Sequence, residues 1–135
     1  MIIESNRQLV NKNSGLVFQF LSNLNNYQTL FPEDKIENWN AAEDFCTCKI
    51  KGLSDIGLKR VATTPNSLIY LDSYGKSPIK FTLNIYLSEV NENQTEIHLV
   101  FEGSSINPFM KMMLEKPLTE FFNSFINKVS EASIS

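Results

Sequence analysis

The sequence predicts an α+β domain in which a curved antiparallel sheet wraps around a long C-terminal helix. Residues 79–90 and 95–101 alternate apolar and polar side chains with the period of two that is typical of strands. Such alternation favours antiparallel strands with one solvated face. Residues 107–131 then switch to the apolar rhythm of a helix. We expect the sheet and this helix to enclose an apolar cavity.

The N-terminal region predicts one strand followed by two short helices. Residues 2–11 are rich in β-branched side chains and form the expected first strand. Ser14 is expected to cap a helix over about 15–22, because its hydroxyl can accept an unpaired amide hydrogen of the first turn. A second helix over about 24–31 ends at Pro32, which disfavours a helical conformation in the residue before it.

The middle of the chain is almost entirely of strand type. Gly, Pro and Asn residues separate its segments, and these residues favour turns for backbone reasons. Residues 36–50 form one or two strands with a break near 40–44. The further strands are expected over 56–63, 67–74, 79–90 and 94–104.

The closing helix carries a wide apolar stripe along one side. At 100° per residue, the stripe consists of Met110, Leu114, Leu118, Phe121, Phe122, Phe125 and Val129. Pro117 removes an amide donor from the middle of the helix, yet the stripe stays in phase across it, so we expect a bent but continuous helix. Met112 falls opposite the stripe and is expected to be exposed.

Length and charge narrow the classes of function. The 135 residues correspond to a single domain over 1–135. The net charge is −3 and the basic residues are scattered along the sequence. Because nucleic-acid binding requires clustered phosphate contacts, we expect no nucleic-acid partner. The sequence contains no apolar run long enough to span a bilayer. Its two cysteines stand two residues apart, which is a poor geometry for a mutual disulfide and fits a reducing compartment. We therefore expect a cytoplasmic protein without an integral membrane segment.

The sequence offers no recognisable set of catalytic or metal-binding residues. His98 is the only histidine, and strand alternation with Ile97 and Leu99 turns it toward solvent. Cys46 and Cys48 with one distant histidine lack the spacing of a zinc site. Glycine-rich phosphate loops are also missing from the sequence. No catalytic residue, metal or cofactor is predicted.

A few polar residues remain as candidate ligand contacts. Arg60 shares strand parity with Leu58, so it either points inward toward an anionic group or extends its long stem to water. Tyr70, Asp72 and Tyr74 share one strand face, which either lines the pocket or is solvated. Arg60 and Tyr70 are kept as candidate ligand-binding residues.

The order of the elements resembles the START-like superfamily, also called SRPBCC, which includes polyketide cyclase/dehydrase and lipid-transport proteins. The resemblance rests on Ser14–Leu21 (SGLVFQFL), the Leu30-Phe31-Pro32 stop, Asn107-Pro108 at the start of the last helix and Lys116-Pro117-Leu118 within it. It covers nearly the whole chain. It implies a helix-grip fold, with a deep cavity for lipids, sterols, polyketides or other hydrophobic molecules.

Carried over by position, the resemblance also implies a set of cavity residues. The lining would consist of Phe81, Leu83, Ile85, Leu99, Phe101, Met110, Leu114 and Phe121. The two short helices would close one rim around Phe20, Leu24 and Phe31.

Three functions remain open at this point. The first is a carrier or sensor that binds a small hydrophobic molecule, lipid, polyketide or isoprenoid-like, in the cavity. The second is a cyclase or dehydratase that uses Arg60, Tyr70, Asp72 or Tyr74, and it requires at least two of these side chains to converge on one point. The third is an interaction module in which the helix ends and Met112 contact a partner. The sequence leaves the oligomeric state undetermined.

Overall fold

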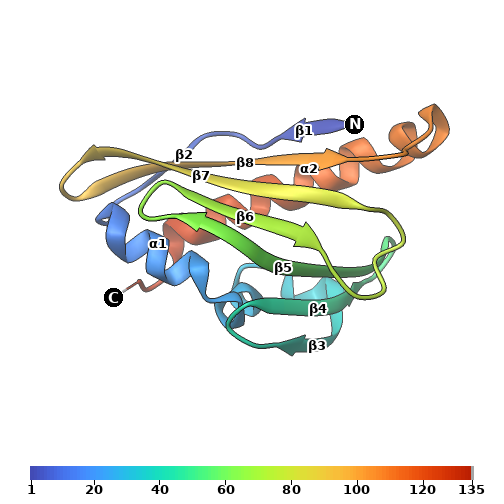
Figure 1. Cartoon of the computed structure of the whole chain (residues 1–135), viewed down its shortest axis with the longest axis horizontal. Coiled ribbons are helices and arrows are strands. Elements are labelled where there is room, and N and C mark those ends of the chain that lie inside the picture. The colour runs from blue at the N-terminus through green and yellow to red at the C-terminus, as the bar shows by residue number, and fades with distance from the viewer. Residues whose placement is uncertain (135) are drawn as a thin grey trace.

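The computed structural model describes residues 1–134 and confirms the α+β class. Figure 1 shows a single curved sheet with the long helix α2 (Pro108–Glu131) lying against one of its faces. The remaining helical segments are short and precede the central strands. They are α1 (Ser14–Ser22) and the 3-10 helices η1 (Leu24–Thr29) and η2 (Glu33–Lys35).

All strand pairs in the sheet are antiparallel, as the alternation predicted. The order across the sheet is β1-β8-β7-β6-β5-β4-β3, and β2 also pairs with β8. The strands are β1 (Ile2–Glu4), β2 (Gln8–Val10), β3 (Ile36–Ala41), β4 (Phe45–Ile50), β5 (Ser54–Thr64), β6 (Leu68–Ser73), β7 (Phe81–Asn91) and β8 (Gln94–Gly103). The break predicted near residues 40–44 falls between β3 and β4.

The N-terminal strand predicted over 2–11 is instead divided into β1 and β2. At the division, the Ser5 hydroxyl accepts a 2.8 Å hydrogen bond from the Leu99 amide, and the Ser5 amide donates to the Leu99 carbonyl at 2.9 Å. A side-chain oxygen thus replaces a backbone acceptor of the ladder. Alternation of apolar residues does not reveal such a substitution, so the sequence predicted one strand.

The cap of α1 also differs from the prediction. Asn13 is the cap, because its side-chain carbonyl accepts a 2.8 Å hydrogen bond from the Gly15 amide. Ser14, predicted as the cap, is the first residue of the helix and is buried. The second predicted helix is the 3-10 helix η1, and the chain leaves it before Pro32 as expected.

The strand faces follow the predicted alternation. On β8, Ile97, Leu99 and Phe101 are buried against α2, whereas His98 lies on the opposite face. The outward orientation predicted for His98 is therefore confirmed. Its imidazole stacks on the ring of Tyr86, with the ring centroids 5.0 Å apart.

Helix α2 runs through Pro117 without interruption, as predicted. Its start is fixed by Asn107, whose side-chain carbonyl accepts a 2.8 Å hydrogen bond from the Met110 amide. The two halves of the helix differ in burial. From Leu118 onward the apolar stripe is buried, whereas the turns before it are largely exposed, and Met112 is 74% exposed as predicted. None of the helices within residues 1–134 has the length and apolarity needed to span a bilayer.

Candidate functional site

An apolar cavity of about 210 Å³ lies under the exposed first half of α2. The β4–β5 turn, the β6–β7 loop and the facing ends of β7 and β8 form its other walls. Its lining consists of Ile50, Leu53, Ser54, Asp55, Ile56, Ser77, Pro78, Ile79, Phe81, Phe101, Met110, Leu114 and Leu118. Ten of these thirteen residues are apolar, so the space suits a nonpolar group.

Aromatic rings in mutual contact form the sheet wall of the cavity. Phe81 begins β7 and its ring lies 5.1 Å from that of Phe101 on β8, between centroids. Phe122 of α2 supports Phe101 from the helix side, with centroids 5.5 Å apart. Because the two strands and the helix hold these rings from both sides, the wall is fixed before any ligand arrives.

A close backbone approach positions the β6–β7 loop at the cavity. The Tyr74 amide donates a 2.9 Å hydrogen bond to the Gly57 carbonyl, and a Cβ at Gly57 would come within 1.9 Å of the Tyr74 carbonyl oxygen. Only glycine permits this approach. Ser77 reinforces it, because its hydroxyl accepts from the Gly57 amide at 2.8 Å and donates to the Tyr74 carbonyl at 3.2 Å. The Ser77 hydroxyl is thereby committed to the protein backbone.

Asp55 is the one charged residue among the lining residues, and its side chain lies on the outer face of the sheet. Asp55 pairs directly with Lys49 across β4 and β5, and both residues are exposed. Opposed residues of an antiparallel pair share a face, so the Asp55 carboxylate points away from the buried neighbours Cys48 and Ile50. Ser54 is left as the polar side chain on the inner face of this wall, and an uncharged ligand fits such a lining.

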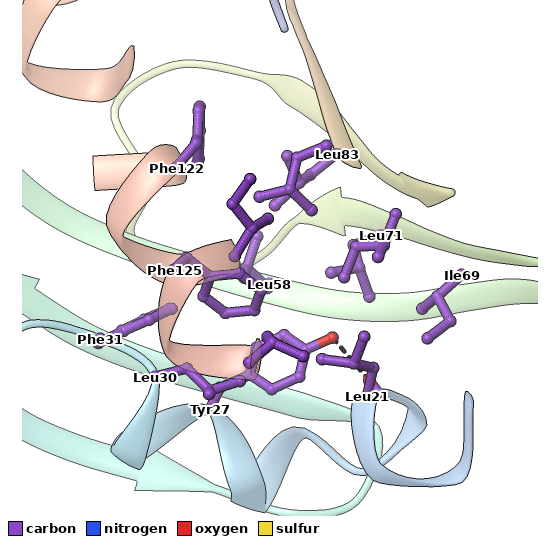
Figure 2. Packing of buried hydrophobic residues seen from close by; sticks show 14 of the residues in the cluster. Leu21, Tyr27, Leu30, Phe31, Leu58, Ile69, Leu71, Leu83, Phe122 and Phe125 are labelled. Carbon is purple, nitrogen blue, oxygen red and sulfur yellow. Dashed lines mark hydrogen bonds between the residues drawn. The ribbon is translucent and has the colours of Figure 1, made fainter. Parts of the chain in front are cut away.

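Beyond the cavity, aromatic side chains fill the space between the sheet and the second half of α2. Tyr27 meets Phe125 edge to face with centroids 5.2 Å apart, and Phe31 meets Phe121 at 5.0 Å. Figure 2 shows Tyr27, Phe31 and Phe125 grouped between the helix and the strands. The resemblance had implied that Phe20, Leu24 and Phe31 form a cavity rim, but Leu24 and Phe31 are fully buried within the core and Phe20 does not line the cavity. The short helices therefore pack into the hydrophobic core and do not border the cavity.

Tyr27 ties the short helices together. Its hydroxyl donates a 2.6 Å hydrogen bond to the Leu21 carbonyl, drawn as the dashed line in Figure 2. Burial raises the pKa of the Tyr27 phenol well above its usual value, and the nearby Cys46 raises it further, while Arg60 lowers it. The phenol stays protonated in the folded protein and acts as a structural donor.

Arg60 is held by backbone carbonyls rather than facing the cavity. Its guanidinium donates to the carbonyl of Ser22 at the end of α1 and to the carbonyl of Glu43 at 3.3 Å. Parity with Leu58 does turn it to the inner side of β5, but the end of α1 meets it there. The expectation that Arg60 contacts a ligand is not supported by this position, because its guanidinium already donates to one carbonyl at the end of α1 and one in the loop before β4.

Tyr70, Asp72 and Tyr74 also lie away from the cavity. Ile69 and Leu71 take the inner face of β6, which places Tyr70 and Asp72 on the outer face beside Thr82 and Glu102. Tyr74 is 38% exposed and packs on Phe45. Tyr70 is therefore not a lining residue, since the apolar side chains of its own strand occupy the interior.

The predicted apolar set divides into two groups. Phe81, Phe101, Met110 and Leu114 line the cavity. Leu83, Ile85 and Leu99 are buried in the core farther along the sheet, where α1 and α2 cover them. Phe121 borders a neighbouring polar cleft instead of the apolar cavity.

This neighbouring cleft has a volume of about 830 Å³ and shares Ile50 and Leu53 with the cavity. Five of its twelve lining residues are charged. The smaller cavity is the better candidate site because its lining is apolar and its shape is set by packed rings.

Sequence reasoning missed the lining residues that come from turns and strand ends. The apolar ones are Ile50, Leu53, Ile56, Pro78 and Ile79, together with Leu118, which had been assigned only to the helix stripe. Ile50 and Ile56 follow the inward parity of buried neighbours on β4 and β5, so that signal was available. Leu53 belongs to a turn, and its inward position depends on the conformation of Gly52 at φ +82°.

The two cysteines lie on the inner face of β4 as free, buried thiols. Burial raises the pKa of Cys46 to about 12 and that of Cys48 to about 11. Neighbouring negative charge adds to both shifts, from Cys48 on Cys46 and from Asp55 on Cys48. Both groups therefore remain protonated and poorly nucleophilic near neutral pH.

Comparison with known proteins places the fold. No family model and no curated protein matches the sequence. A START superfamily protein from Mycobacterium smegmatis superposes with a TM-score of 0.74 at 10% identity, covering 96% of this chain and 94% of that one. The Zhui aromatase/cyclase from Streptomyces sp. R1128 gives 0.76 at 15% identity over 97% and 92%. Norcoclaurine synthase from Thalictrum flavum gives 0.75 at 11% identity over 97% and 91%.

The chain has the helix-grip fold of the START superfamily. Identities of 10–15% carry the fold alone, and the agreement covers almost the full length of each chain. The helix-grip arrangement expected from the order of elements is thus confirmed. In this chain, aromatic side chains fill the space between the sheet and the second half of α2, whereas the cavity lies between the sheet and the first half.

Proposed function

We propose that this helix-grip protein binds a small, uncharged hydrophobic molecule in the cavity under the first half of α2. The observation that carries the proposal is the apolar lining, in which ten of thirteen residues are nonpolar and the Ser77 hydroxyl is bonded to backbone. An apolar ligand gains free energy by leaving water for such a surface, at roughly 25 cal/mol per Å² of buried area. A charged ligand would lose hydration without finding an inward-facing partner.

The volume limits the size of the ligand. A cavity of roughly 150 Å³ holds a benzene molecule, and typical drug-sized sites occupy about 300–1,000 Å³. The present cavity, at about 210 Å³, therefore suits one ring or two fused rings. A long acyl chain or a polyketide of several rings would need the space that Tyr27, Phe31 and Phe121 occupy.

Carriage or sensing of the ligand is favoured over cyclisation or dehydration. The enzymatic alternative required Arg60, Tyr70, Asp72 or Tyr74 to converge in the pocket. Arg60 is hydrogen-bonded to the Ser22 carbonyl at the end of α1 and to the Glu43 carbonyl in the loop before β4, and the tyrosines and Asp72 lie on other surfaces. The aromatase/cyclase and the norcoclaurine synthase are enzymes by name, but at 11–15% identity they share only their fold with this chain. That shared fold supports a cavity that holds a ligand.

The test is a methyl NMR titration with ligands of graded size. We expect indole and 2-naphthol to shift the methyl signals of Leu114, Leu118 and Ile56, because these side chains line the cavity. Palmitate should produce weaker shifts, since its chain exceeds the available volume. Filling the cavity with Leu114→Phe should abolish the response to 2-naphthol.

A matched substitution distinguishes filling of the cavity from a general effect of adding a phenylalanine to the protein. Leu16→Phe places the same change on a residue that is 36% exposed on α1, away from the lining, and should leave the titration unchanged. Backbone amide shifts centred on Glu120 and Lys128, recorded in the same titration, would place the ligand in the polar cleft and contradict the proposal, as would tightest binding to palmitate.

A further inference from the structure

We infer that the exposed flank of the first half of α2 docks on an anionic lipid surface. The flank consists of Phe109, Met112, Met113 and Lys116. Met112 and Met113 each lie three or four residues from both Phe109 and Lys116, so the four form one continuous strip on the helix surface. The inference concerns a surface of the molecule rather than the cavity, and it stands independently of the proposed ligand.

The strip is apolar and exposed to an unusual degree for this chain. Met112 is 74% exposed, Phe109 is 65% exposed and Met113 is 58% exposed. They include three of the four most exposed large hydrophobic residues within residues 1–134, the fourth being Ile2. Scattered single apolar residues are common on surfaces, whereas three on one helix flank indicate a contact surface. Figure 1 shows the first turns of α2 projecting at one end of the molecule.

The charge around the strip selects the occupant. The three segments that surround the cavity, residues 51–56, 75–79 and 107–118, carry four lysines and two carboxylates. The lysines are Lys51, Lys76, Lys111 and Lys116, and all four are exposed. This local excess of two positive charges occurs on a chain whose net charge is −3. Basic side chains around exposed Phe and Met residues complement a surface of anionic headgroups above acyl chains.

The flexible thioethers suit the same occupant. Methionine side chains adapt to irregular apolar surroundings, as a lipid surface requires. Lys116 stands one turn beyond Met112 and Met113, so its ammonium can reach headgroups while the methionines enter the acyl boundary. Met110 and Leu114 line the cavity from the neighbouring stripe of the same helix. The docked segment of α2 would therefore be the one that covers the cavity.

The experiment is flotation with vesicles of defined composition. Wild-type protein is mixed with vesicles of pure phosphatidylcholine or of phosphatidylcholine with 40% phosphatidylglycerol, at low salt and at 0.5 M NaCl. We expect at least a fivefold larger bound fraction on the anionic vesicles at low salt, reduced by salt because exposed charges are screened. The triple variant Phe109→Gln, Met112→Gln and Met113→Gln should lose most of this binding, and Lys111→Gln with Lys116→Gln should remove the preference for anionic lipid.

Matched variants at other positions test specificity. Val90→Gln removes a side chain that is 54% exposed on the β7–β8 hairpin, at the opposite end of the molecule in Figure 1, and should leave flotation unchanged. Lys12→Gln with Lys59→Gln removes two exposed lysines outside the three segments and should preserve the lipid preference. Circular dichroism melts establish that each variant is folded.

Two results would overturn the inference. One is wild-type protein that stays unbound on anionic vesicles at low salt, which would leave an acidic protein as the occupant of the strip. The other is an equal loss of binding in the strip variants and the matched variants. Neither result depends on the methyl titration with small aromatic ligands, so failure here leaves the proposed cavity function standing.

Discussion

The ring of Phe31 meets the ring of Phe121 at 5.0 Å between centroids, with an interplanar angle of 64°. This contact joins the chain segment before Pro32 to the middle of α2, two regions far apart in the sequence. The contact lies between the packed core beside the second half of α2 and the cavity under the first half of this helix. The pair thus limits how far a ligand can extend along the helix.

Replacing Phe121 should reveal this packing. Phe121→Ala removes a ring that Phe31 and Phe122 surround, and we expect it to lower the free energy of unfolding by about 3–5 kcal/mol. Leu114→Ala is the matched change at the cavity wall, where the side chain is half-buried and borders vacant space, so less than about 2 kcal/mol should be lost. Urea unfolding measures both values, and equal losses would mean that the interior is not divided in this way.

The Tyr27 hydroxyl should behave as a buried structural donor. Tyr27→Phe leaves the buried Leu21 carbonyl without its partner and should cost about 1–3 kcal/mol in urea unfolding.

An alkaline absorbance titration follows the Tyr27 ionisation directly. Because its pKa is raised, the stability gained from the neutral phenol is present below pH 10 and declines as pH rises beyond that value. Of the four tyrosines, Tyr27 should ionise only on unfolding, and Tyr27→Phe should remove that step. Ionisation of Tyr27 in the native state near pH 10 would contradict the assignment.

The two thiols provide a second pH dependence. Both folded pKa values, about 12 for Cys46 and about 11 for Cys48, lie above the usual value near 9. The unfolded chain therefore releases these protons first, so thiol-linked stability is complete below pH 9 and is lost as pH rises toward 11 and 12. We expect the free energy of unfolding to fall more steeply between pH 9 and 11 in wild-type protein than in Cys48→Ala. A disulfide-exchange reagent should label neither native thiol at pH 7, and rapid labelling would show that the thiols are accessible.

Gly57 should be irreplaceable for steric reasons. Gly57→Ala sets a methyl group within 1.9 Å of the Tyr74 carbonyl oxygen, a backbone atom that cannot move without breaking the β6–β7 loop, so we expect a loss above about 2 kcal/mol.

Gly52→Ala is the matched control for Gly57→Ala. At φ +82° with open space around its Cβ position, it should cost only the roughly 1–2 kcal/mol of a left-handed backbone. Thermal unfolding compares the two variants, and a smaller loss at position 57 than at position 52 would refute the close approach.

Periodic patterns predicted the elements of this fold because they record which faces are buried. The alternation in β7 and β8 and the stripe of α2 located the inner faces correctly, including the outward position of His98. The division of the first strand depended on one serine hydroxyl, which leaves no periodic trace. Local side-chain bonds of this kind lie outside what apolar spacing can record.

The part of the site on β7, β8 and the first turns of α2 was predicted, whereas the part on the ends of β4 and β5 and on the turns was missed. Phe81, Phe101, Met110 and Leu114 follow from parity and phase. Leu53 depends on a glycine turn. Arg60 had the predicted parity, but its partners are carbonyls brought from α1 and the loop before β4, and only tertiary structure places them there.

The most direct measurement is a crystal structure of the protein soaked with 4-bromophenol, in which the bromine gives an anomalous signal. We expect a single strong anomalous peak in the cavity, between Phe81, Leu114 and Leu118. Leu114→Phe crystals soaked in the same way should lose the peak. A peak in the cleft beside Glu120 and Lys128, or an empty cavity at a concentration that saturates binding in solution, would contradict the claim that this cavity is the binding site.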